Sequence, residues 1–150
     1  MRAVGSTFHS LHYHIVFGTK GRIPAIEPAW IAEFHRYIGG SVKRLGGIAT
    51  CVGGVADHVH LLLSLGTNSP PSPLVRELKK ASTSWARAHH SPSFAWQEGY
   101  GIFTVSPTHL DALKHYIARQ EEHHRQVSFR DEFRRLLEVN GIEFKPEYLP

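Results

Sequence analysis

The sequence has only one cysteine among its 150 residues, Cys51, so an internal disulfide is excluded and a reducing compartment is expected. Long apolar runs are missing too, since no stretch approaches the roughly 18 residues of a membrane-spanning helix. The first residues lack the hydrophobic segment of a secretion signal, and no repeat or low-complexity tract occurs. We therefore expect a soluble, cytoplasmic protein, and the sequence excludes collagen-like, disordered and membrane-spanning classes.

The composition is that of a globular protein with an uneven charge. Hydrophobic residues make up 41% and charged residues 20%, which predicts one domain over residues 1–150 with a core of its own. The net charge is +4, but residues 1–120 carry 12 basic and 6 acidic groups, whereas residues 121–150 carry 5 and 7. The basic excess in the first four-fifths favours a polyanionic partner. Twelve histidines are a more unusual feature than the charge.

The periodicity of apolar residues predicts an α+β fold. Period-2 alternation predicts strands, and apolar residues spaced three and four apart predict helices. The strands are expected at 10–19, 48–55, 57–65 and 96–105, and the helices at 28–45, 73–90, 107–124 and 131–140. The order β-α-β-β-α-β-α-α predicts a ferredoxin-like split βαβ fold: an antiparallel sheet with helices on one face, plus C-terminal helices. In this topology the first and third strands are central neighbours.

For the second predicted helix, the sequence also predicts the first residue, the N-cap and the buried stripe. Pro73 is expected as its first residue, with Ser72 as N-cap. Its core stripe is predicted to contain Leu74, Leu78, Ala81 and Trp85.

Paired histidines lie on two predicted central strands. His58 and His60 are two residues apart, so both project from the face opposite Val59, Leu61 and Leu63. His12 and His14 do the same on the first strand, so four imidazoles are predicted to share an open face of the sheet. Two imidazoles at this spacing hold a divalent ion if a third ligand is present, although the same pattern also fits a merely polar surface. Asp57 either hydrogen-bonds an imidazole or caps the turn.

Tyr116 and Gln120 are one helical turn apart on the third predicted helix, so their side chains lie on the same stripe. Each has an ordinary interpretation, Tyr116 as a packing residue and Gln120 as a solvated polar group. Next to a bound metal ion, a tyrosine hydroxyl serves as a nucleophile on an activated phosphate and a glutamine oxygen completes the metal's ligands.

Five segments, in order, resemble single-tyrosine HUH transposases of the insertion-sequence-200-like and 605-like group, which includes REP-associated tyrosine transposases. The segments are His14-Ile-Val-Phe-Gly-Thr-Lys-Gly-Arg22, Ala56-Asp-His-Val-His-Leu-Leu-Leu63, Leu74-Val-Arg-Glu-Leu-Lys-Lys80, Trp96-Gln-Glu-Gly-Tyr100 and Tyr116-Ile-Ala-Arg-Gln120. The resemblance covers a core of about residues 10–124, and the acidic tail from 125 to 150 is expected to be packing or dimer surface.

The resemblance implies a bacterial enzyme with a defined set of roles. His58, His60 and Gln120 would bind Mg²⁺ or Mn²⁺, with Asp57 and His14 supporting the imidazoles. Tyr116 would attack single-stranded DNA, with possible hairpin ends, and keep the 5′-phosphate as a phosphotyrosine while a 3′-OH is released. The later resealing of that ester would serve transposition of a small insertion sequence. Members of the family are homodimers whose sites can combine two subunits.

Basic residues for phosphate contact occur in two places. They are Lys20 and Arg22 after the first strand, and Arg76, Lys79, Lys80 and Arg87 on the second predicted helix. For each one, a solvated surface position is the simpler interpretation.

Three other functions remain open. A non-catalytic nucleic-acid-binding module would use the same sheet, and a histidine-rich metal sensor or storage protein would use the same imidazoles. A domesticated relative that nicks DNA without moving its own gene fits equally well.

Overall fold

The computed structural model describes residues 5–150, and its centre is a four-stranded antiparallel sheet. The strands are β1 (His12–Gly18), β2 (Ile48–Val55), β3 (His58–Ser64) and β4 (Gly101–Thr104), in the spatial order β2-β3-β1-β4. The central strands β1 and β3 pair so that His60 lies opposite Val16 and His58 opposite Gly18. The predicted ferredoxin-like α+β fold and its central strand pair are confirmed.

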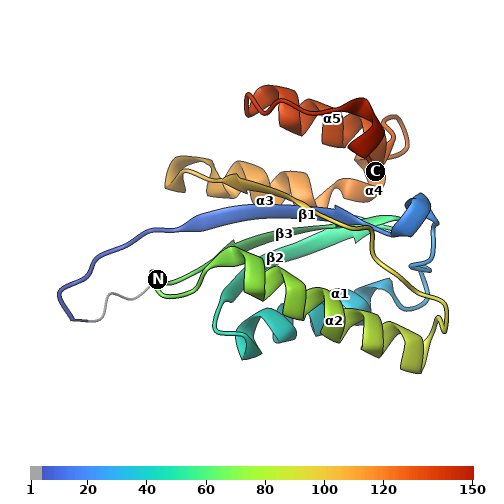
Figure 1. Cartoon of the computed structure of the whole chain (residues 1–150), viewed down its shortest axis with the longest axis horizontal. Helices are drawn as coiled ribbons and strands as arrows, with labels where there is room; N and C mark the ends of the chain where they lie inside the picture. Colours follow the sequence, from blue (N-terminus) through green and yellow to red (C-terminus); the bar gives the residue numbers. More distant parts are fainter. Residues whose placement is uncertain (1–4) are drawn as a thin grey trace.

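Helices cover both faces of the sheet, as Figure 1 shows. One face carries α1 (Ile31–Arg44) and α2 (Pro71–His89), and the other carries α3 (Leu110–Ala118), α4 (Gln120–His123) and α5 (Phe129–Val139). Single 3-10 turns occur at Lys20–Arg22, Pro107–His109 and Pro146–Tyr148. The histidine-bearing face was expected to be open, and that expectation is wrong because α3, α4 and α5 cover it.

The face toward α1 and α2 holds the larger hydrophobic core. Alternate residues of the two central strands point into it, as the period-2 pattern predicted. From the strands it contains Ile15, Phe17, Val59, Leu61 and Leu63, and from the helices Phe34, Ile38, Val42, Leu74, Val75 and Leu78, all buried. This apolar layer fixes the sheet to its two helices independently of the polar face.

The second helix differs in detail from its prediction. It begins at Pro71, because proline has no N–H to leave unbonded and its φ already suits a first helical turn. Its buried stripe continues through Ser82 and Ala86 rather than through Ala81 and Trp85. Trp85 is half-buried and stacks on Phe34, with ring centroids 5.6 Å apart. Its assignment to the core was therefore only partly correct.

Several other boundaries also differ. The first helix begins at Ile31, three residues after its predicted start at Pro28. Strand β4 contains only Gly101–Thr104, since Trp96 makes a single bridge to Thr19 and the chain then leaves the sheet. The third predicted helix is interrupted at Arg119, whose φ of −103° and ψ of 22° separate α3 from α4.

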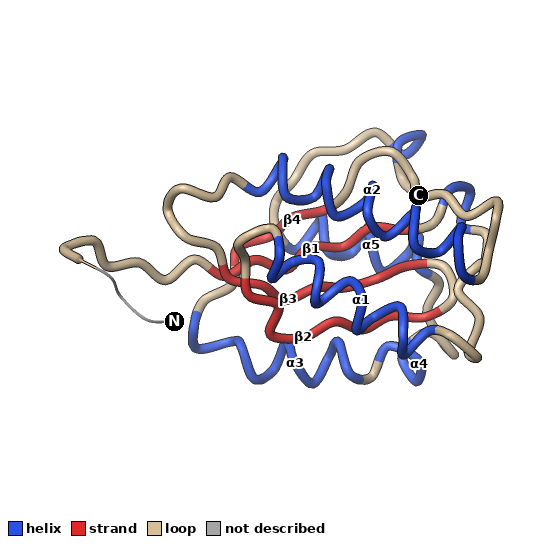
Figure 2. The backbone as a smooth tube through the Cα atoms, turned by 90° about the horizontal axis from the view of Figure 1, so that it is seen from below, coloured by secondary structure: helices blue, strands red, loops and turns tan. Residues whose placement is uncertain are grey.

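The C-terminal helices divide the other face between them. Helix α3 runs beside β2 (Figure 2), and α5 lies over β1 and β4 through a second apolar cluster. That cluster contains Val16, Phe103, Phe129, Phe133, Leu137 and Leu149. The side chain of Ser128 caps α5 by accepting a hydrogen bond from the backbone N–H of Asp131 at 3.2 Å. The strip of sheet between α3 and α5 is where the histidines lie. Within residues 5–150, no helix combines the length and the apolar character needed to cross a bilayer.

Close contact between α3 and the sheet depends on Gly53. A Cβ at this position would lie 2.5 Å from the backbone oxygen of Ile117 and 2.7 Å from its Cγ2. We expect Gly53→Ala to push α3 away and lower the free energy of unfolding by about 1–3 kcal/mol, measured by urea titration. Gly66→Ala, where nothing lies within 4 Å, is the control and should change stability by no more than about 0.5 kcal/mol. Equal effects of the two substitutions would contradict this explanation.

Candidate metal and tyrosine site

The two histidines of β3 are completely buried beneath the C-terminal helices. His58 and His60 both have 0% exposure, and they project from the face opposite Val59 and Leu61, as predicted. The ring of Phe129, at the start of α5, stacks on His58 with centroids 4.1 Å apart and planes 8° from parallel. Room for this ring exists because residue 18, opposite His58, is glycine: a Cβ there would lie 2.5 Å from Phe129.

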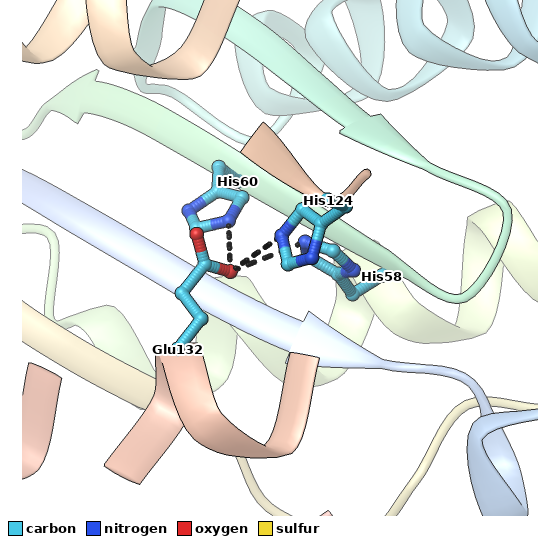
Figure 3. A group of neighbouring side chains, drawn as sticks. All are labelled: His58, His60, His124 and Glu132. Carbon is cyan, nitrogen blue, oxygen red and sulfur yellow. Dashed lines mark hydrogen bonds and ion pairs between the residues drawn. The ribbon is translucent and has the colours of Figure 1, made fainter. Parts of the chain in front are cut away.

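A single carboxylate oxygen lies at the centre of three imidazoles, as Figure 3 shows. Oε1 of Glu132, from α5, is 3.3 Å from Nε2 of His58 and 3.0 Å from Nε2 of both His60 and His124. The candidate ligand atoms of these four residues all lie within 4.8 Å of one another. Imidazole nitrogens and a carboxylate oxygen are common metal donors, so the cluster could bind a divalent ion.

Each imidazole is also held from its outer side. Nδ1 of His58 is 2.7 Å from Oδ1 of Asp57, and Nδ1 of His124 is 2.6 Å from the backbone oxygen of Val127. Nδ1 of His60 is 2.7 Å from Nε2 of the buried His14. Asp57 and His14, the two residues expected to support the imidazoles, therefore contact the cluster's rings directly. His12 instead bonds Ser10 and Ser64 and does not belong to the cluster.

Tyr116 and Gln120 reach the same carboxylate from α3 and α4. The hydroxyl of Tyr116 donates a hydrogen bond to Oε2 of Glu132, and the Gln120 amide donates to the same oxygen at 3.1 Å. Oε1 of Gln120 lies 3.0 Å from Nε2 of His58. Gln120 is buried rather than solvated, and Tyr116 is half-buried. The two histidines of β3, the tyrosine and the glutamine therefore meet within one chain.

Burial and the central carboxylate shift the protonation of the site. Burial alone would raise the pKa of Glu132, but hydrogen bonds from His124, His58 and His60 outweigh it and hold that pKa far below its usual range. For His58, burial lowers the pKa, but hydrogen bonds to Asp57 and Glu132 raise it to about 9. Burial, together with Glu132, raises the pKa of Tyr116 above its ordinary value of 10.0.

The pKa values of His14 and His60 shift in the opposite direction from that of His58. Burial, followed by the charge of His60, lowers the pKa of His14 to about 3. Burial likewise lowers the pKa of His60, despite its contact with Glu132. The metal-free site therefore combines an ionised carboxylate, a charged His58 and a neutral His14 in a dry environment, where each charge depends strongly on its partner.

The basic residues expected to contact DNA lie in different layers. Arg76, Lys80 and Arg87 are exposed on α2, across the sheet from the histidines. The Lys79 ammonium donates to the backbone oxygens of Gln97 and Gly99, and burial lowers its pKa to about 8. Lys20 and Arg22 are both exposed. Of the six, only Arg22 lines a hollow that also borders the cluster, where it lies with Asp57, His124 and Arg125.

Sequence reasoning missed two members of the cluster, His124 and Glu132. Both lie near or in the acidic tail, which was interpreted as packing or dimer surface; α5 does pack, but it also delivers Glu132 to the centre of the site. One signal was available: Glu132 lies beside Phe129, Phe133 and Leu137 on the apolar side of α5, and a carboxylate in such a stripe needs a buried cationic partner. His124 is one turn after Gln120.

The raised pKa of His58 predicts a pH dependence of stability. Because the pKa is about 9 in the folded chain and 6.5 as a reference, the stabilisation from its charge is complete below about pH 6.5 and is lost as pH rises through 9. We expect the stability difference between the wild type and Asp57→Asn, both metal-free, to be largest near pH 6 and to shrink toward pH 9.5. Chemical unfolding with a chelator present measures it, and a difference independent of pH would contradict the assignment.

Two solved structures share the fold of this chain. A candidate transposase from Deinococcus radiodurans R1 superimposes with a TM-score of 0.65 at 22% identity, covering 80% of this chain and 98% of that one. A REP-associated tyrosine transposase bound to a REP hairpin gives a TM-score of 0.61 at 15% identity, covering 85% of this chain and 76% of that one. No curated protein sequence matches at a significant level.

The sequence matches the family model described as "Transposase IS200 like" over residues 7–120. This segment includes His58, His60, Tyr116 and Gln120, and it ends before His124 and Glu132. The match spans well over half of the chain, and the fold agrees with it. The chain belongs to the IS200-like transposase family, a family of DNA-cleaving enzymes.

Proposed function

We propose that this transposase cuts and rejoins single-stranded DNA through a covalent bond between Tyr116 and a 5′-phosphate, with the help of a divalent metal ion. The observation that carries the proposal is the meeting of the Tyr116 hydroxyl with the His58 and His60 imidazoles on one carboxylate of the same chain. A phenol held beside a candidate metal cluster is the arrangement that nucleophilic attack on a phosphate requires.

The residues present fit a divalent ion. His58 and His60 offer Nε2 atoms, and Gln120 offers an oxygen 3.0 Å from Nε2 of His58, so these three residues would hold the metal. When bound, Mg²⁺ or Mn²⁺ supplies Lewis-acid polarisation of a phosphate oxygen. Asp57 and His14 fix the orientation of the two imidazoles from their outer sides.

The chemical step conserves phosphoester bonds. The hydroxyl oxygen of Tyr116 loses its proton and attacks phosphorus, the bond from phosphorus to the 3′-oxygen breaks, and that oxygen takes up one proton from solvent to become a 3′-OH. Oε2 of Glu132 already accepts the hydroxyl hydrogen bond, so this carboxylate is the group within reach of the tyrosine proton. The reverse attack by a 3′-OH reseals the strand without an external energy source, which serves transposition of a small insertion sequence.

One copy of the chain brings together all the groups that this proposal assigns to the reaction. Tyr116 and His60 have ring centroids 5.7 Å apart in the same chain, so the proposed chemistry needs no residue from a second copy. A homodimer remains a prediction of the family resemblance, and sedimentation velocity measures it. Hairpin DNA ends are supported as a partner by the REP-associated relative, which was solved bound to a hairpin.

Replacing the nucleophile tests the reaction directly. We expect wild-type protein with Mg²⁺ or Mn²⁺ to form a covalent adduct with a labelled single-stranded oligonucleotide carrying the element's end, seen as a shifted band in a denaturing gel. Tyr116→Phe should abolish the adduct and leave oligonucleotide binding intact. An adduct that survives in Tyr116→Phe would reject Tyr116, and binding without any adduct in the wild type would favour the non-catalytic module.

A hollow beside Tyr116 offers a route by which the phosphate could reach the hydroxyl. It has a volume of about 460 Å³ and is lined by Tyr116, His123, Glu132 and Arg135 together with apolar residues. Arg135 is exposed, and its guanidinium is the strongest phosphate donor in this lining. The phosphate group therefore has a cation at the entrance and a phenol at the inner wall.

Arg135→Ala tests this entry route. We expect adduct formation to slow by about 10- to 100-fold, the equivalent of a charged hydrogen bond of about 1.5–3 kcal/mol, and the salt dependence of binding to weaken by about one phosphate contact. Arg134→Ala is the matched control, because it removes the same charge from the adjacent position but does not line the hollow. Equal losses in the two variants would show that only net charge matters.

A further inference from the structure

One side of α5 forms the wall opposite Tyr116 in the hollow beside that tyrosine, here called the α5 hollow. Residues spaced three or four apart share one side of a helix. Four residues of α5 at this spacing line the hollow: Glu132, Arg135, Leu136 and Val139. Glu132 is buried, whereas Arg135 and Val139 are exposed. From its buried end outward, this wall therefore changes from a carboxylate to a cation and an aliphatic surface.

The aliphatic part of the wall is only partly used to pack α5 on the sheet. The buried cluster beneath α5 contains the two phenylalanines of this helix and Leu137, and Leu136 only borders it. Val139 is 75% exposed and belongs to neither buried cluster of the chain that the structure describes. Val127 lines the same hollow from the loop before α5. An aliphatic surface that faces the nucleophile is thus available to a substrate.

A second hollow, here called the α3 hollow, shares a wall with the first. It has a volume of about 470 Å³, and Tyr116, His123 and Val127 line both hollows. The rings of Tyr116 and His123 meet edge to face with centroids 5.3 Å apart, so they form a ridge between the two. Arg119 and Glu122 line only the α3 hollow, which makes it the more polar of the two. An extended ligand that lies across the ridge occupies both hollows.

The substrate of the proposed function is an extended ligand of this kind. A phosphate attacked by the Tyr116 hydroxyl must lie at the ridge, so the nucleotides on its two sides extend into the two hollows. Arg135 on one side and Arg119 on the other offer a cation to the phosphates. The rest of the α5 hollow offers aliphatic side chains, and burying the flat face of a base against them is favourable.

We propose that Val127, Leu136 and Val139 bind one unpaired base of the DNA, next to the phosphate that the tyrosine attacks. This inference rests on the proposed function and adds to it a subsite for the substrate. In a duplex each base is stacked on both faces, so only an unstacked base presents a face to this wall. The subsite therefore favours single strands. Its three residues lie beyond the segment that matches the family model.

The chemistry of the subsite predicts that it tolerates any of the four bases. The three aliphatic side chains carry no hydrogen-bond donor or acceptor, so they do not distinguish the edges of the bases. The base is held by burial of its face, and every base has such a face. Exchanging the bound base for another should therefore change the affinity by no more than about 3-fold, whereas removing it should weaken binding by about 10-fold.

A scan with abasic DNA tests the subsite in Tyr116→Phe protein, in which binding is measured without reaction. The probe is a fluorescent single-stranded oligonucleotide carrying the element's end, in versions that each lack one base, and anisotropy in Mg²⁺ gives each affinity. We expect one position, beside the bond that the wild type cleaves, where loss of the base weakens binding by about 10-fold. A scan without such a position overturns the proposal.

Variants of α5, made in the same Tyr116→Phe protein, connect this base to the wall. Val139→Ser and Leu136→Ala should each weaken binding of the complete oligonucleotide by about 3- to 10-fold, but should not weaken binding of the version without the critical base, because that contact is already lost. Ile142→Ser is the matched control, since Ile142 is also exposed and apolar but does not line the hollow. Circular dichroism checks the fold of Leu136→Ala, and the exposed Val139 keeps the test valid if that variant unfolds. Equal losses with both oligonucleotides would show that the wall does not contact the base.

The outcomes separate this inference from the proposed function. If the wild type forms the covalent adduct but the α5 variants bind every oligonucleotide like their parent, the subsite fails and the reaction stands. If the base-dependent losses occur but the wild type forms no adduct, the reaction fails and the subsite stands. If Val139→Ser instead converts a dimer into a monomer in sedimentation velocity without changing DNA affinity, the wall is an interface between two copies and the proposal is wrong.

Discussion

The layer formed by α3, α4 and α5 depends on the interactions of one buried group, the carboxylate of Glu132. A carboxylate with 2% exposure is strongly unfavourable unless every lone pair has a partner, and here the partners come from β3, α3, α4 and the residue after α4. The charged His58 in turn needs a negative group, because its ring is as buried as the carboxylate. Burying the carboxylate without its imidazole partners would be unfavourable. The position of α5 over the sheet is therefore determined by charge as well as by its phenylalanines. Removing one partner leaves the others buried and uncompensated, which is why such clusters are sensitive to single substitutions.

The two faces of the sheet have different roles: one packs the larger hydrophobic core, and the other holds the imidazole cluster. Toward α1 and α2 the strands present an apolar layer, in which Phe17 and Leu61 are fully buried. Toward α3 and α5 the same strands present imidazoles, with an apolar cluster on one side only. Alternation along a strand makes this possible, because adjacent residues such as Val59 and His60 serve opposite layers. The apolar layer fixes the backbone of β3, so the spacing of its two histidines does not depend on the less favourable polar layer.

Much of the fold follows from local pattern, but the complete site does not. Alternation in β1 and β3 and the order of the elements were enough to predict the central strand pair and the common face of His58 and His60. The rotation of α2 was missed because Ala81 and Ser82 are both small, so the sequence hardly distinguishes the buried one. Glu132 was missed for a different reason: the residue that it contacts, His60, is 72 residues away in the sequence. Helical periodicity shows that α5 is amphipathic, but the surface that it covers is decided by tertiary contacts that no short window contains.

Three side chains from one stretch of sequence, Tyr116, Gln120 and His124, reach a single carboxylate across the boundary between α3 and α4. In a continuous helix, residues 116 and 124 would be about 12 Å apart along the axis, at a rise of about 1.5 Å per residue. The two oxygens of Glu132 serve different side chains: Oε2 accepts from Tyr116 and Gln120, and Oε1 lies 3.0 Å from Nε2 of His124. In the structure, α3 ends at Ala118 and α4 begins at Gln120, and both Tyr116 and His124 contact Glu132. Backbone hydrogen bonds continue across Arg119, from its N–H to the oxygen of His115 and from the N–H of His123 to the oxygen of Arg119, so the boundary is a local change in the backbone angles of one residue. The tyrosine of the family motif and a histidine outside it therefore meet through the carboxylate that α5 supplies, so the complete site depends on α5 as well as on the motif.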